Sequence, residues 1–433
     1  MAQPIRRMEI LLDGQVQSDV PGQTRSSADS KSENLLNSFS AIIQVAPVAA
    51  ATSADLSLRA TLLDGQVLQQ RILVLNLIPF ETEVAPLPAA SFEDAPLVAV
   101  CMATYNPPLA LFRRQIDSIV RQSHQHWRCI VSDDLSSPES LAAMREVLAR
   151  DPRFTLSVAP QRAGFYRNFE RALSLVPAEA QFVMLCDQDD CWHAGKTETL
   201  LTAFGERQVR TTLAYSDMRV VDASGRILSE TFWTVRRNNY TDLVSLLLAN
   251  CVTGAATMFR HELLDLLLPF PPPVSDLYHD HWLGCLALAV GRLEYVDRPL
   301  YDYTQHDGNV IGNNAPPRQD FPRLIYYTFR EMFSAEGRER ARAIYFEKVL
   351  KTEALAQALL VRGGNRISPR NRRRLRRLAN LEHSWFGWAW LALRGLKGWR
   401  RTNETMGAEY LLLLGLTWRC YSALFSSRFG TER

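Results

Sequence analysis

Residues 97–205 alternate between short apolar runs and amphipathic segments, and this alternation constrains the fold more than any other feature of the chain. Apolar runs of strand length occur at 97–103, 127–132, 154–159 and 182–186. The segments that follow them, 109–123, 138–149, 166–176 and about 195–205, have the periodicity of helices that bury one face. Such alternation predicts an α/β fold with a doubly wound, mostly parallel sheet.

The fourth apolar run, FVMLC, ends in a cluster of carboxylates formed by Asp187, Asp189 and Asp190. Open α/β sheets bind their ligands beyond the carboxyl ends of the strands. Carboxylates this close repel one another, so a cation that neutralises them is their natural complement. The alternative is a polar turn that is simply acidic, and this stretch by itself leaves both interpretations open.

Length and composition set the outer limits. With 433 residues the chain is longer than one typical core and predicts two or three domains. Its seven cysteines form no CxxC pair, which favours a reducing compartment and argues against a zinc site. The N-terminal stretch has no uninterrupted apolar core of a signal peptide, and no run of about 18 uncharged apolar residues predicts a spanning helix.

Residues 1–90 have a different pattern and predict a small β-rich domain. The string LLDGQV occurs twice, at 11–16 and 62–67. Asp-Gly between strand-like runs indicates a hairpin. A sugar-binding or docking module and a structural extension both remain open for this domain. The segment PLPAASFEDAP, 86–96, is expected to link it to the next domain, which we place at 91–318.

The chain beyond residue 238 is expected to be mainly helical. Residues 239–270 predict a helix, a short break and a second helix, ended by a run of three prolines. A further helix is expected within 275–290, followed by a short strand and a polar loop over 291–312.

Residues 319–433 form a helical, basic region. The arginine-rich stretch 366–378 contains no acidic residue and precedes the tryptophan-rich stretch 385–399. This combination favours a surface that lies in the interface of an anionic membrane. A helical bundle that caps the catalytic domain is the alternative. Nucleic-acid binding is not expected, because no base-reading motif accompanies the charge.

Five segments in order resemble the family-2 glycosyltransferases of the GT-A fold, in particular their rhamnosyltransferase-like branch. They are VAVCMATYNPPLALFRRQIDSIVRQSHQHWRCIVSDDLSS, GFYRNFERAL, LCDQDDCW, YHDHW and YTQHDGNVIG. The resemblance covers about 97–312. It implies an enzyme that transfers a sugar from a nucleoside diphosphate to an acceptor hydroxyl.

The resemblance also implies roles for individual residues. Donor or nucleotide contacts are expected from Thr104, Tyr105, Asn106, Asp133, Asp134, Gly164, Arg167, Asn168, Gln188 and Asp190. The two aspartates at 133 and 134 are alternatively caps at a strand end, and the three residues from 164 to 168 alternatively belong to a helix surface.

Metal and catalytic roles follow from the same resemblance. Asp187 and Asp189 correspond to the DxD motif that holds Mg²⁺ or Mn²⁺, and His306 completes the metal shell or reaches the diphosphate; the alternative is a solvated loop histidine. Asp280 occupies the place of the catalytic base, although it is alternatively the N-cap of the next helix. Its neighbours His279, His281 and Trp282 are expected to orient it or to contact the acceptor.

Some positions depart from the family pattern. Leu135 replaces a common Gly, and residues 193–195 replace a Leu-Pro-Glu-like run. Around His306, Thr304, Asp307 and Gly308 replace the usual Arg, Gly and Asn. This last set of changes puts phosphate contacts from that loop in doubt.

Together these features predict an inverting, metal-dependent glycosyltransferase. Its acceptor would be a hydroxyl group of a surface glycan such as lipopolysaccharide or capsule. The growing glycan would be lipid-linked and would meet the enzyme at the cytoplasmic face of the membrane. One alternative is another metal-dependent nucleotide enzyme, such as a nucleotidyltransferase, but TYNPPLALFRR lacks the Gly-rich basic loop that it would need. The other is a non-catalytic glycan-binding or scaffold protein.

Overall fold

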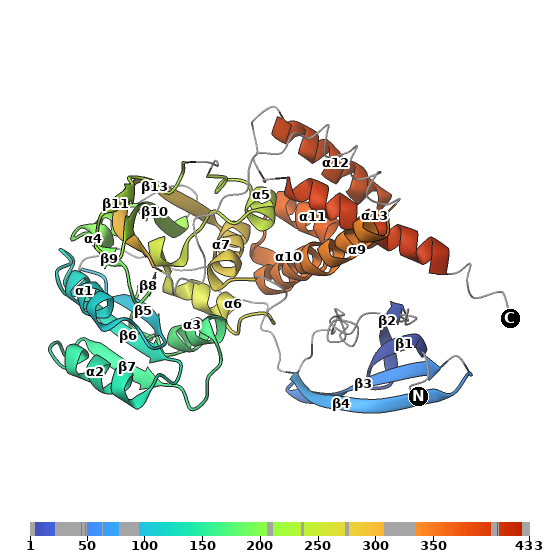
Figure 1. The fold of residues 1–433 in the computed structure, drawn as a ribbon, viewed down its shortest axis with the longest axis horizontal. Helices are drawn as coiled ribbons and strands as arrows, with labels where there is room; N and C mark the ends of the chain where they lie inside the picture. The colour runs from blue at the N-terminus through green and yellow to red at the C-terminus, as the bar shows by residue number, and fades with distance from the viewer. Residues whose placement is uncertain are drawn as a thin grey trace. The chain divides into compact units, whose positions relative to one another are not determined.

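The computed structural model describes residues 5–21, 45, 48, 50–62, 64–77, 95–205, 211–234, 238–272, 277–306, 334–399, 405 and 407–426. The chain forms two compact units, Met1–Pro86 and Leu87–Arg433. Figure 1 shows the elements of both units in the order of the chain.

The first unit contains a four-stranded antiparallel sheet in the order β2-β1-β3-β4. Its strands are β1 (Ile5–Leu12), β2 (Gln15–Pro21), β3 (Thr52–Leu62) and β4 (Val67–Leu77). The two copies of LLDGQV lie at the two hairpins, β1–β2 and β3–β4. Asp13 and Gly14 have φ angles of 48° and 78°, the left-handed conformation that a tight Asp-Gly hairpin turn requires.

The second unit is built on a nine-stranded sheet whose main path is β7-β6-β5-β8-β12-β10-β13-β9. The strands β5 (Val98–Thr104), β6 (Trp127–Asp133), β7 (Phe154–Val158) and β8 (Phe182–Cys186) are parallel neighbours, as the alternation predicts. The α/β class is therefore confirmed. The far half of the sheet is mixed, because β12 (Thr257–Arg260) runs antiparallel to both β8 and β10 (Thr211–Asp222).

The helices of the parallel half lie where the sequence places them. They are α1 (Leu109–Val120), α2 (Pro138–Leu148), α3 (Phe165–Ser174) and α4 (Lys196–Thr202). Helix α2 begins as expected: the Ser137 hydroxyl accepts a hydrogen bond from the Ser140 N–H at 3.2 Å, and Pro138 follows the cap. Helix α1 buries the side chains of Phe112, Ile116 and Ile119 in the core of the second unit.

The expectation of two helices over 239–270 is wrong in its second half. Helix α5 (Leu243–Leu248) is followed by a 3₁₀ turn (Gly254–Ala256), the strand β12, a second 3₁₀ turn (His261–Leu263) and a short α6 (Leu264–Leu267). A four-residue strand shows too little periodicity to be separated from a buried helix. The next helix, α7 (His279–Val290), agrees with the prediction.

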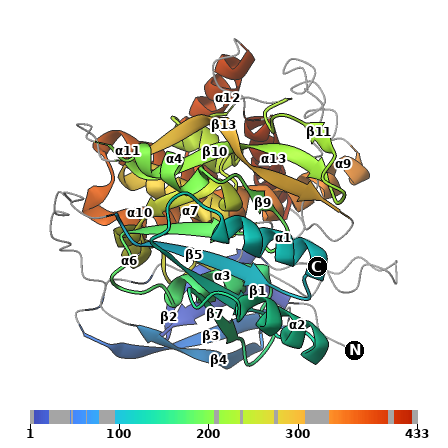
Figure 2. The same cartoon turned by 90° about the vertical axis from the view of Figure 1, so that its left-hand side faces the viewer.

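Strand β13 (Arg292–Gln305) is much longer than the short strand expected there, and it pairs in parallel with β10 along most of its length (Figure 2). It also pairs with the two-residue β9 (Cys191–Trp192), which directly follows the acidic cluster. The small β11 (Ile227–Ser229) extends β10 on its other side. Strand β13 thus carries its last residues to the carboxyl end of β8.

The C-terminal helices are α9 (Ala335–Ile344), α10 (Leu350–Gly363), α11 (Pro369–Leu378), α12 (Trp385–Trp399) and α13 (Ala408–Ser426), with a π-helical turn at Tyr345–Val349. They gather beside α5 and α7 (Figure 1), and α10 contacts α5, α6 and α7. Arg374 and Arg394 both pair with Asp242, the N-cap of α5, at 2.9 and 2.6 Å. No helix within the described ranges combines the length and the apolar character needed to cross a bilayer.

Candidate active site

A cavity of about 880 Å³ opens at the carboxyl ends of β5 and β8. Its wall includes the ends of both strands, the start of α3, the segment after α5, the first turn of α7, and parts of the C-terminal helices. Most of the site residues expected from the sequence lie on this wall: Thr104, Tyr105, Asp134, Gly164, Asn168, Asp187, Gln188, Asp189, His279, Asp280 and His281.

Asp134 holds the loop before α3 in place. Its two carboxylate oxygens accept hydrogen bonds from the Ala163 and Gly164 N–H groups, at 2.7 and 2.8 Å. Gly164 has a φ of 83°, a left-handed conformation that suits glycine. Asn168, on the first turns of α3, donates to the backbone carbonyls of Thr104 and Ser132. These bonds join the ends of β5 and β6 to the start of α3 and shape one side of the cavity.

Tyr105 forms a flat surface at the same end of the cavity. The Arg162 guanidinium lies 4.0 Å from the centre of its ring, and the Tyr105 N–H donates to the Gln188 side chain at 2.9 Å. The second bond connects the turn after β5 with the turn after β8. Arg162 also lies on the cavity wall, although no sequence motif drew attention to it.

The acidic turn after β8 brings the carboxylates of Asp187, Asp189 and Asp190 together in a largely buried place. Burial raises the pKa of Asp187 to about 7, and the charges of Asp189 and Asp280 act in the same direction. Lys196 acts against this shift, but burial lowers the pKa of its own ammonium group to about 7. The Lys196 Nζ donates to the Ala255 carbonyl at 2.5 Å and lies 4.0 Å from the centre of the Trp192 ring.

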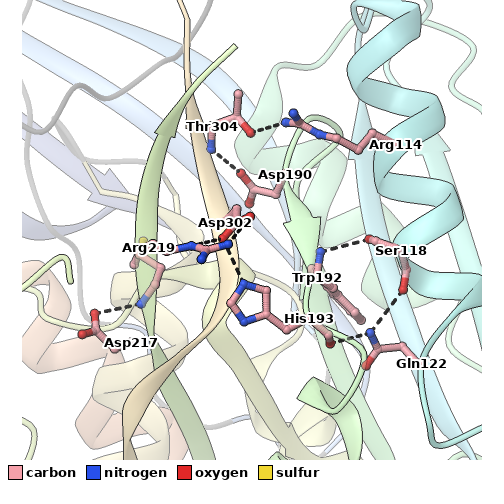
Figure 3. A network of polar contacts seen from close by, with 11 residues as sticks. Arg114, Ser118, Gln122, Asp190, Trp192, His193, Asp217, Arg219, Asp302 and Thr304 are labelled. Atoms are coloured by element: carbon pink, nitrogen blue, oxygen red, sulfur yellow. Dashed lines mark hydrogen bonds and ion pairs between the residues drawn. The ribbon is translucent and has the colours of Figure 1, made fainter. Parts of the chain in front are cut away.

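His306 lies beside Asp189, with its Nε2 2.9 Å from Oδ2 of the carboxylate. The contact depends on a network that joins the acidic turn to the end of β13 (Figure 3). Asp190 accepts a hydrogen bond from the Thr304 N–H at 3.2 Å, while Arg114 donates to the Thr304 hydroxyl at 2.6 Å and to the Asp189 carbonyl at 3.3 Å. Thr304, where the family pattern has Arg, therefore anchors this loop.

Asp280 is held in one orientation on the first turn of α7. Its Oδ1 accepts a hydrogen bond from the Asn250 amide at 3.1 Å, and its Oδ2 accepts one from the Gly254 N–H at 3.3 Å. Burial raises the pKa of Asp280 to about 6, although these hydrogen bonds act to lower it. A carboxylate with a pKa near neutrality is suited to accept a proton.

The two histidines on either side of Asp280 differ in their contacts. His279 stacks on Phe169 with ring centres 3.9 Å apart, and neither ring nitrogen has a hydrogen-bond partner among the described residues. Burial lowers the pKa of His279 to about 3, so the imidazole is neutral at neutral pH. His281 instead has its Nε2 3.1 Å from the Leu246 carbonyl, which ties α7 to α5.

Several residues predicted to touch the donor or the acceptor are absent from the cavity wall. Asp133 is buried and accepts hydrogen bonds from Thr104 and Ser136, and Asp190 is buried beneath Thr304. These two carboxylates support the turns instead of facing the cavity.

Four further predicted residues lie off the wall: Asn106, Arg167, Trp282 and His306, the last of which contacts Asp189. Asn106 shapes the turn after β5 by accepting from the Ser137 N–H at 2.9 Å. Arg167 pairs with Glu170 at 2.5 Å, away from the acidic turn, and Trp282 is fully buried with its N–H donated to the Leu267 carbonyl. The helix-surface alternative fits Arg167, and Trp282 is a packing residue.

The site also contains residues that the sequence motifs did not reveal. Asn250 and Gly254 orient Asp280, and Lys348 and Lys351 reach the cavity from the C-terminal helices. No local signal marks them, because each lies far along the chain from the residues that it joins.

The acidic turn fits a divalent cation. Asp189 and His306 offer oxygen and nitrogen ligands within 2.9 Å of each other, and the raised pKa of Asp187 indicates that further positive charge would stabilise the ionised form. Within the described ranges no three or more metal-ligating side chains form a complete cage. Mg²⁺ commonly needs only one or two protein ligands and takes the others from phosphate and water.

Comparisons with known proteins place one part of the chain in relation to a known family. Residues 99–268 match the model of glycosyl transferase family 2. An Escherichia coli protein named UDP-Glc:alpha-D-GlcNAc-diphosphoundecaprenol beta-1,3-glucosyltransferase WfgD is 26% identical over 197 residues, 45% of this chain and 71% of that protein. An uncharacterized glycosyltransferase of Methanocaldococcus jannaschii is 22% identical over 196 residues, 45% of this chain and 66% of that protein.

Coverage varies among the relatives, and the chain spans only 11% of an uncharacterized protein of Sinorhizobium fredii with which it is 29% identical over 99 residues. Among solved structures, S. aureus TarS 1-349 in complex with UDP-GlcNAc shares 14% identity and a TM-score of 0.41, over 76% of this chain and 92% of that chain. The family match includes the carboxyl ends of β5, β6 and β8, which line or support the cavity. Residues 99–268 thus correspond to the glycosyl transferase family 2 model, and the chain shares this region with proteins that are named glycosyltransferases.

Proposed function

We propose that this protein is an inverting, metal-dependent glycosyltransferase that transfers a sugar from a nucleoside diphosphate to a hydroxyl group of a surface glycan. One observation carries the proposal. Asp187 and Asp189 line the same cavity as Asp280, and Asp280 has its pKa raised to about 6 by burial. The carboxylates that would bind the cation and the carboxylate that would accept the proton therefore line the same cavity.

The nucleotide of the donor would lie at the β5 and β6 end of the cavity. Tyr105 and Arg162 offer stacking surfaces there, and Asp134 and Thr104 offer polar groups. The HDHW segment that contains Asp280 supports a place for the chain in the rhamnosyltransferase-like branch of the family.

Asp189 and His306 would hold Mg²⁺ or Mn²⁺, with Asp187 beside them. When bound, the cation supplies positive charge that offsets the charge of the diphosphate leaving group. The chain's own contribution is to fix the two ligands. Arg114 and Thr304 hold the turns that carry them.

Asp280 would act as the general base. Asn250 and Gly254 hold both carboxylate oxygens, so the proton from the acceptor hydroxyl is taken at a fixed position. The acceptor oxygen would attack the anomeric carbon on the face opposite the diphosphate. Because a single carboxylate serves a single displacement, the configuration at that carbon is inverted.

His279 would contact the acceptor. It lines the cavity next to Asp280, and its neutral imidazole offers one donor and one acceptor nitrogen. Both nitrogens are buried, so a hydroxyl group of the acceptor sugar would satisfy a polar atom that otherwise lacks a partner.

The acceptor is proposed to be lipid-linked and to reach the enzyme at an anionic membrane surface. Trp385, Phe386 and Leu393 of α12 have exposed fractions of 76%, 90% and 60%. Arg373 and Arg376 of the neighbouring basic helix α11 are also exposed. Exposed aromatic and basic side chains together favour binding in the membrane interface. The name of the E. coli relative WfgD includes a diphosphoundecaprenol-linked sugar, which supports a lipid-linked acceptor.

The membrane contact is tested by co-sedimentation with vesicles of phosphatidylglycerol and phosphatidylcholine. Changing Trp385 and Phe386 to Ser should release most of the protein from the vesicles. The matched control is Val361→Ser on α10, an exposed apolar residue outside α12. Equal binding of the Trp385/Phe386 variant and the native chain would exclude this surface.

The catalytic assignment is tested by separating donor binding from turnover. Asp189→Ala should remove most of the Mn²⁺-dependent part of UDP binding in calorimetry. Asp280→Asn should keep UDP binding but lower the transfer rate by about 10²–10⁴, the usual contribution of a general base. Near-normal transfer by the Asp280 variant would rule out its role as the base.

A further inference from the structure

Two aromatic side chains on the cavity wall have no role in the transfer described above. Phe165 is the first residue of α3, and Tyr278 is the residue directly before α7. Their rings form an offset stack, with centres 5.4 Å apart and planes inclined by 29°. Phe165 keeps 39% of its surface exposed. Neither residue was expected from the sequence to form part of the site.

The ring pair lies on the side of the cavity that holds the proposed base. Phe165 and Phe169 are four positions apart in α3, so their side chains leave the same face of the helix. Phe169 stacks on His279 with ring centres 3.9 Å apart, and Phe165 meets the same imidazole edge to face at 6.3 Å. This face of α3 therefore packs against the start of α7, where Asp280 directly follows His279.

The backbone fixes the positions of both rings. Gly164 precedes Phe165, takes a φ of 83° and donates its N–H to the Asp134 carboxylate at 2.8 Å. Tyr278 has an extended backbone, with φ −98° and ψ 155°, and the helix begins at the next residue. Because each ring is attached where a helix begins, a ligand would meet a surface that is already formed and would lose less freedom on binding.

Polar groups border the two rings. His279 and the Asp280 carboxylate line the same cavity, and neither ring nitrogen of His279 has a hydrogen-bond partner among the described residues. A ligand for this part of the cavity should therefore combine an apolar face with hydroxyl groups at its rim. A pyranose has this character, because its C–H groups can meet the negative face of an aromatic ring while its hydroxyl groups point outward.

We propose that Phe165 and Tyr278 form an aromatic subsite that stacks against one face of a pyranose ring of the acceptor. The hydroxyl groups of that ring would then reach His279 and Asp280. The subsite rests on the proposed sugar transfer, since it would present an acceptor hydroxyl to the base. It adds the chemical class of the group held on the acceptor side, a pyranose bound through its C–H face.

The competing ligand is the nucleobase of the donor, which could also stack on an aromatic ring. The contacts of the pair favour the sugar. Phe165 and Tyr278 adjoin the first turn of α7, which carries the proposed base. The groups proposed to hold the nucleotide, Tyr105 and Asp134, instead follow the carboxyl ends of β5 and β6.

The test uses the full chain with UDP and Mn²⁺ in the donor site, and saturation-transfer NMR with four methyl pyranosides as probes. These are the β-D-glucoside, the β-D-galactoside, the N-acetyl-β-D-glucosaminide and the α-D-mannoside. At least one should bind, and its ring C–H protons should receive most saturation when the aromatic protons of the protein are irradiated. Phe165→Leu should raise the Kd of that glycoside by about five- to tenfold, because leucine keeps the apolar volume but lacks the ring. Tyr278→Leu should act in the same direction.

Two control variants separate the ring from other effects. Tyr278→Phe keeps the ring and removes only the hydroxyl group, so it should bind the glycoside as the native chain does. Phe346→Leu removes a half-buried ring of the C-terminal helices that is not on the cavity wall, and it should also leave the Kd unchanged.

Several outcomes would overturn the aromatic subsite. They are native affinity in both leucine variants, failure of all four glycosides to bind the native chain, and glycoside binding that disappears when UDP and Mn²⁺ are added. A loss of UDP affinity in Phe165→Leu as large as the loss of glycoside affinity would assign the pair to the nucleobase instead.

This result is separable from that of the proposed function. Both leucine variants should bind UDP with native affinity, since neither change lies at the acidic turn. If the native chain bound no UDP in the presence of Mn²⁺, the donor assignment would fail, whereas ring-dependent binding of a glycoside would still stand.

Discussion

The Asn250 amide donates a hydrogen bond to Oδ1 of Asp280 at 3.1 Å and joins the segment after α5 to the first turn of α7. The Gly254 N–H bonds to the other oxygen, so the orientation of the base depends on this segment. If Asp280 is the base that we propose, Asn250 is a positioning residue, because it would act on the reaction through Asp280.

Replacing Asn250 should therefore alter the base without removing it. Asn250→Ala should lower kcat by about tenfold, which corresponds to a loss of roughly 1.4 kcal/mol of transition-state stabilisation, because the Asp280 carboxylate is no longer held in one orientation. The affinity for UDP should stay unchanged. Asn250→Asp should also move the acid limb of the pH–rate profile upward, since a second carboxylate raises the pKa of the first. Asn365→Ala, at an exposed position, is the control. A native profile in Asn250→Asp would contradict the role.

The pH dependence of transfer should report Asp280. Burial raises its pKa from 3.8 to about 6, and only the ionised carboxylate can accept a proton. The rate should therefore be near its maximum above about pH 7 and fall tenfold per pH unit below about pH 5. The measurement is kcat/KM for the donor across this range at saturating Mn²⁺. A flat profile down to about pH 4.5, in protein that stays folded, would contradict this assignment.

Much of the parallel half of the fold could be predicted from local sequence patterns. The N-cap Ser137 and Pro138 mark the start of α2, and the apolar run 182–186 marks β8, because both signals lie within a few neighbouring residues. Strand β12 could not be predicted in this way. Its four residues are a strand only because β8 and β10 are there to pair with it.

The residues of the site also divide into those that the sequence could predict and those that it could not. Asp187, Asp189 and Asp280 stand in recognisable motifs, and all three reach the cavity. Asn250 lies in a segment predicted to be a helix break, thirty positions from its partner Asp280, so no short pattern could reveal the hydrogen bond. Trp282 shows the reverse limit, since its place in the HDHW motif suggested contact with the acceptor, yet its ring fills the core.

Gly254 should not tolerate a side chain. A Cβ at this position would lie 2.6 Å from Nε2 of His279, so the imidazole would have to move away from Phe169. We expect Gly254→Ala to destabilise the fold by about 1–3 kcal/mol and to raise KM for the acceptor. Chemical denaturation and acceptor kinetics measure the two effects. Gly205→Ala is the control, because its Cβ would meet only ordinary contact distances, and native acceptor kinetics in Gly254→Ala would speak against an acceptor role for His279.

Removing His306 should weaken the binding of Mn²⁺. Its Nε2 lies 2.9 Å from Asp189, so the cation would lose one of two adjacent ligands. His306→Ala should lower Mn²⁺ affinity by about tenfold or more in the presence of UDP, as measured by electron paramagnetic resonance. The control is His383→Ala, at an exposed position in the C-terminal region. Unchanged Mn²⁺ affinity in His306→Ala would show that this histidine serves only to hold the Asp189 side chain.

Arg394 should be essential for holding the C-terminal helices on α5 and α7. It pairs with Asp242 at 2.6 Å and with Glu409 at 3.3 Å, and only 8% of its side chain is exposed. Arg394→Met would leave two largely buried carboxylates with less compensation, so the free energy of unfolding should fall by about 3–5 kcal/mol near pH 7.

The loss should be smaller in mild acid. Burial raises the pKa of Glu409, while Arg394 acts against that shift, so its protonation becomes easier once the arginine is gone. The proton removes one uncompensated charge, and the difference from the native chain should therefore narrow as the pH falls from about 7 to about 5. Burial raises and Arg394 lowers the pKa of Asp242, so the loss of the arginine should raise this pKa as well and act in the same direction. Urea denaturation at both pH values measures the effect, with the exposed Arg373→Met as the control. If the free energy of unfolding fell no further in Arg394→Met than in the control, the ion pairs of Arg394 would not stabilise the fold. Apolar contacts alone would then hold α12 and α13 against the rest of the second unit.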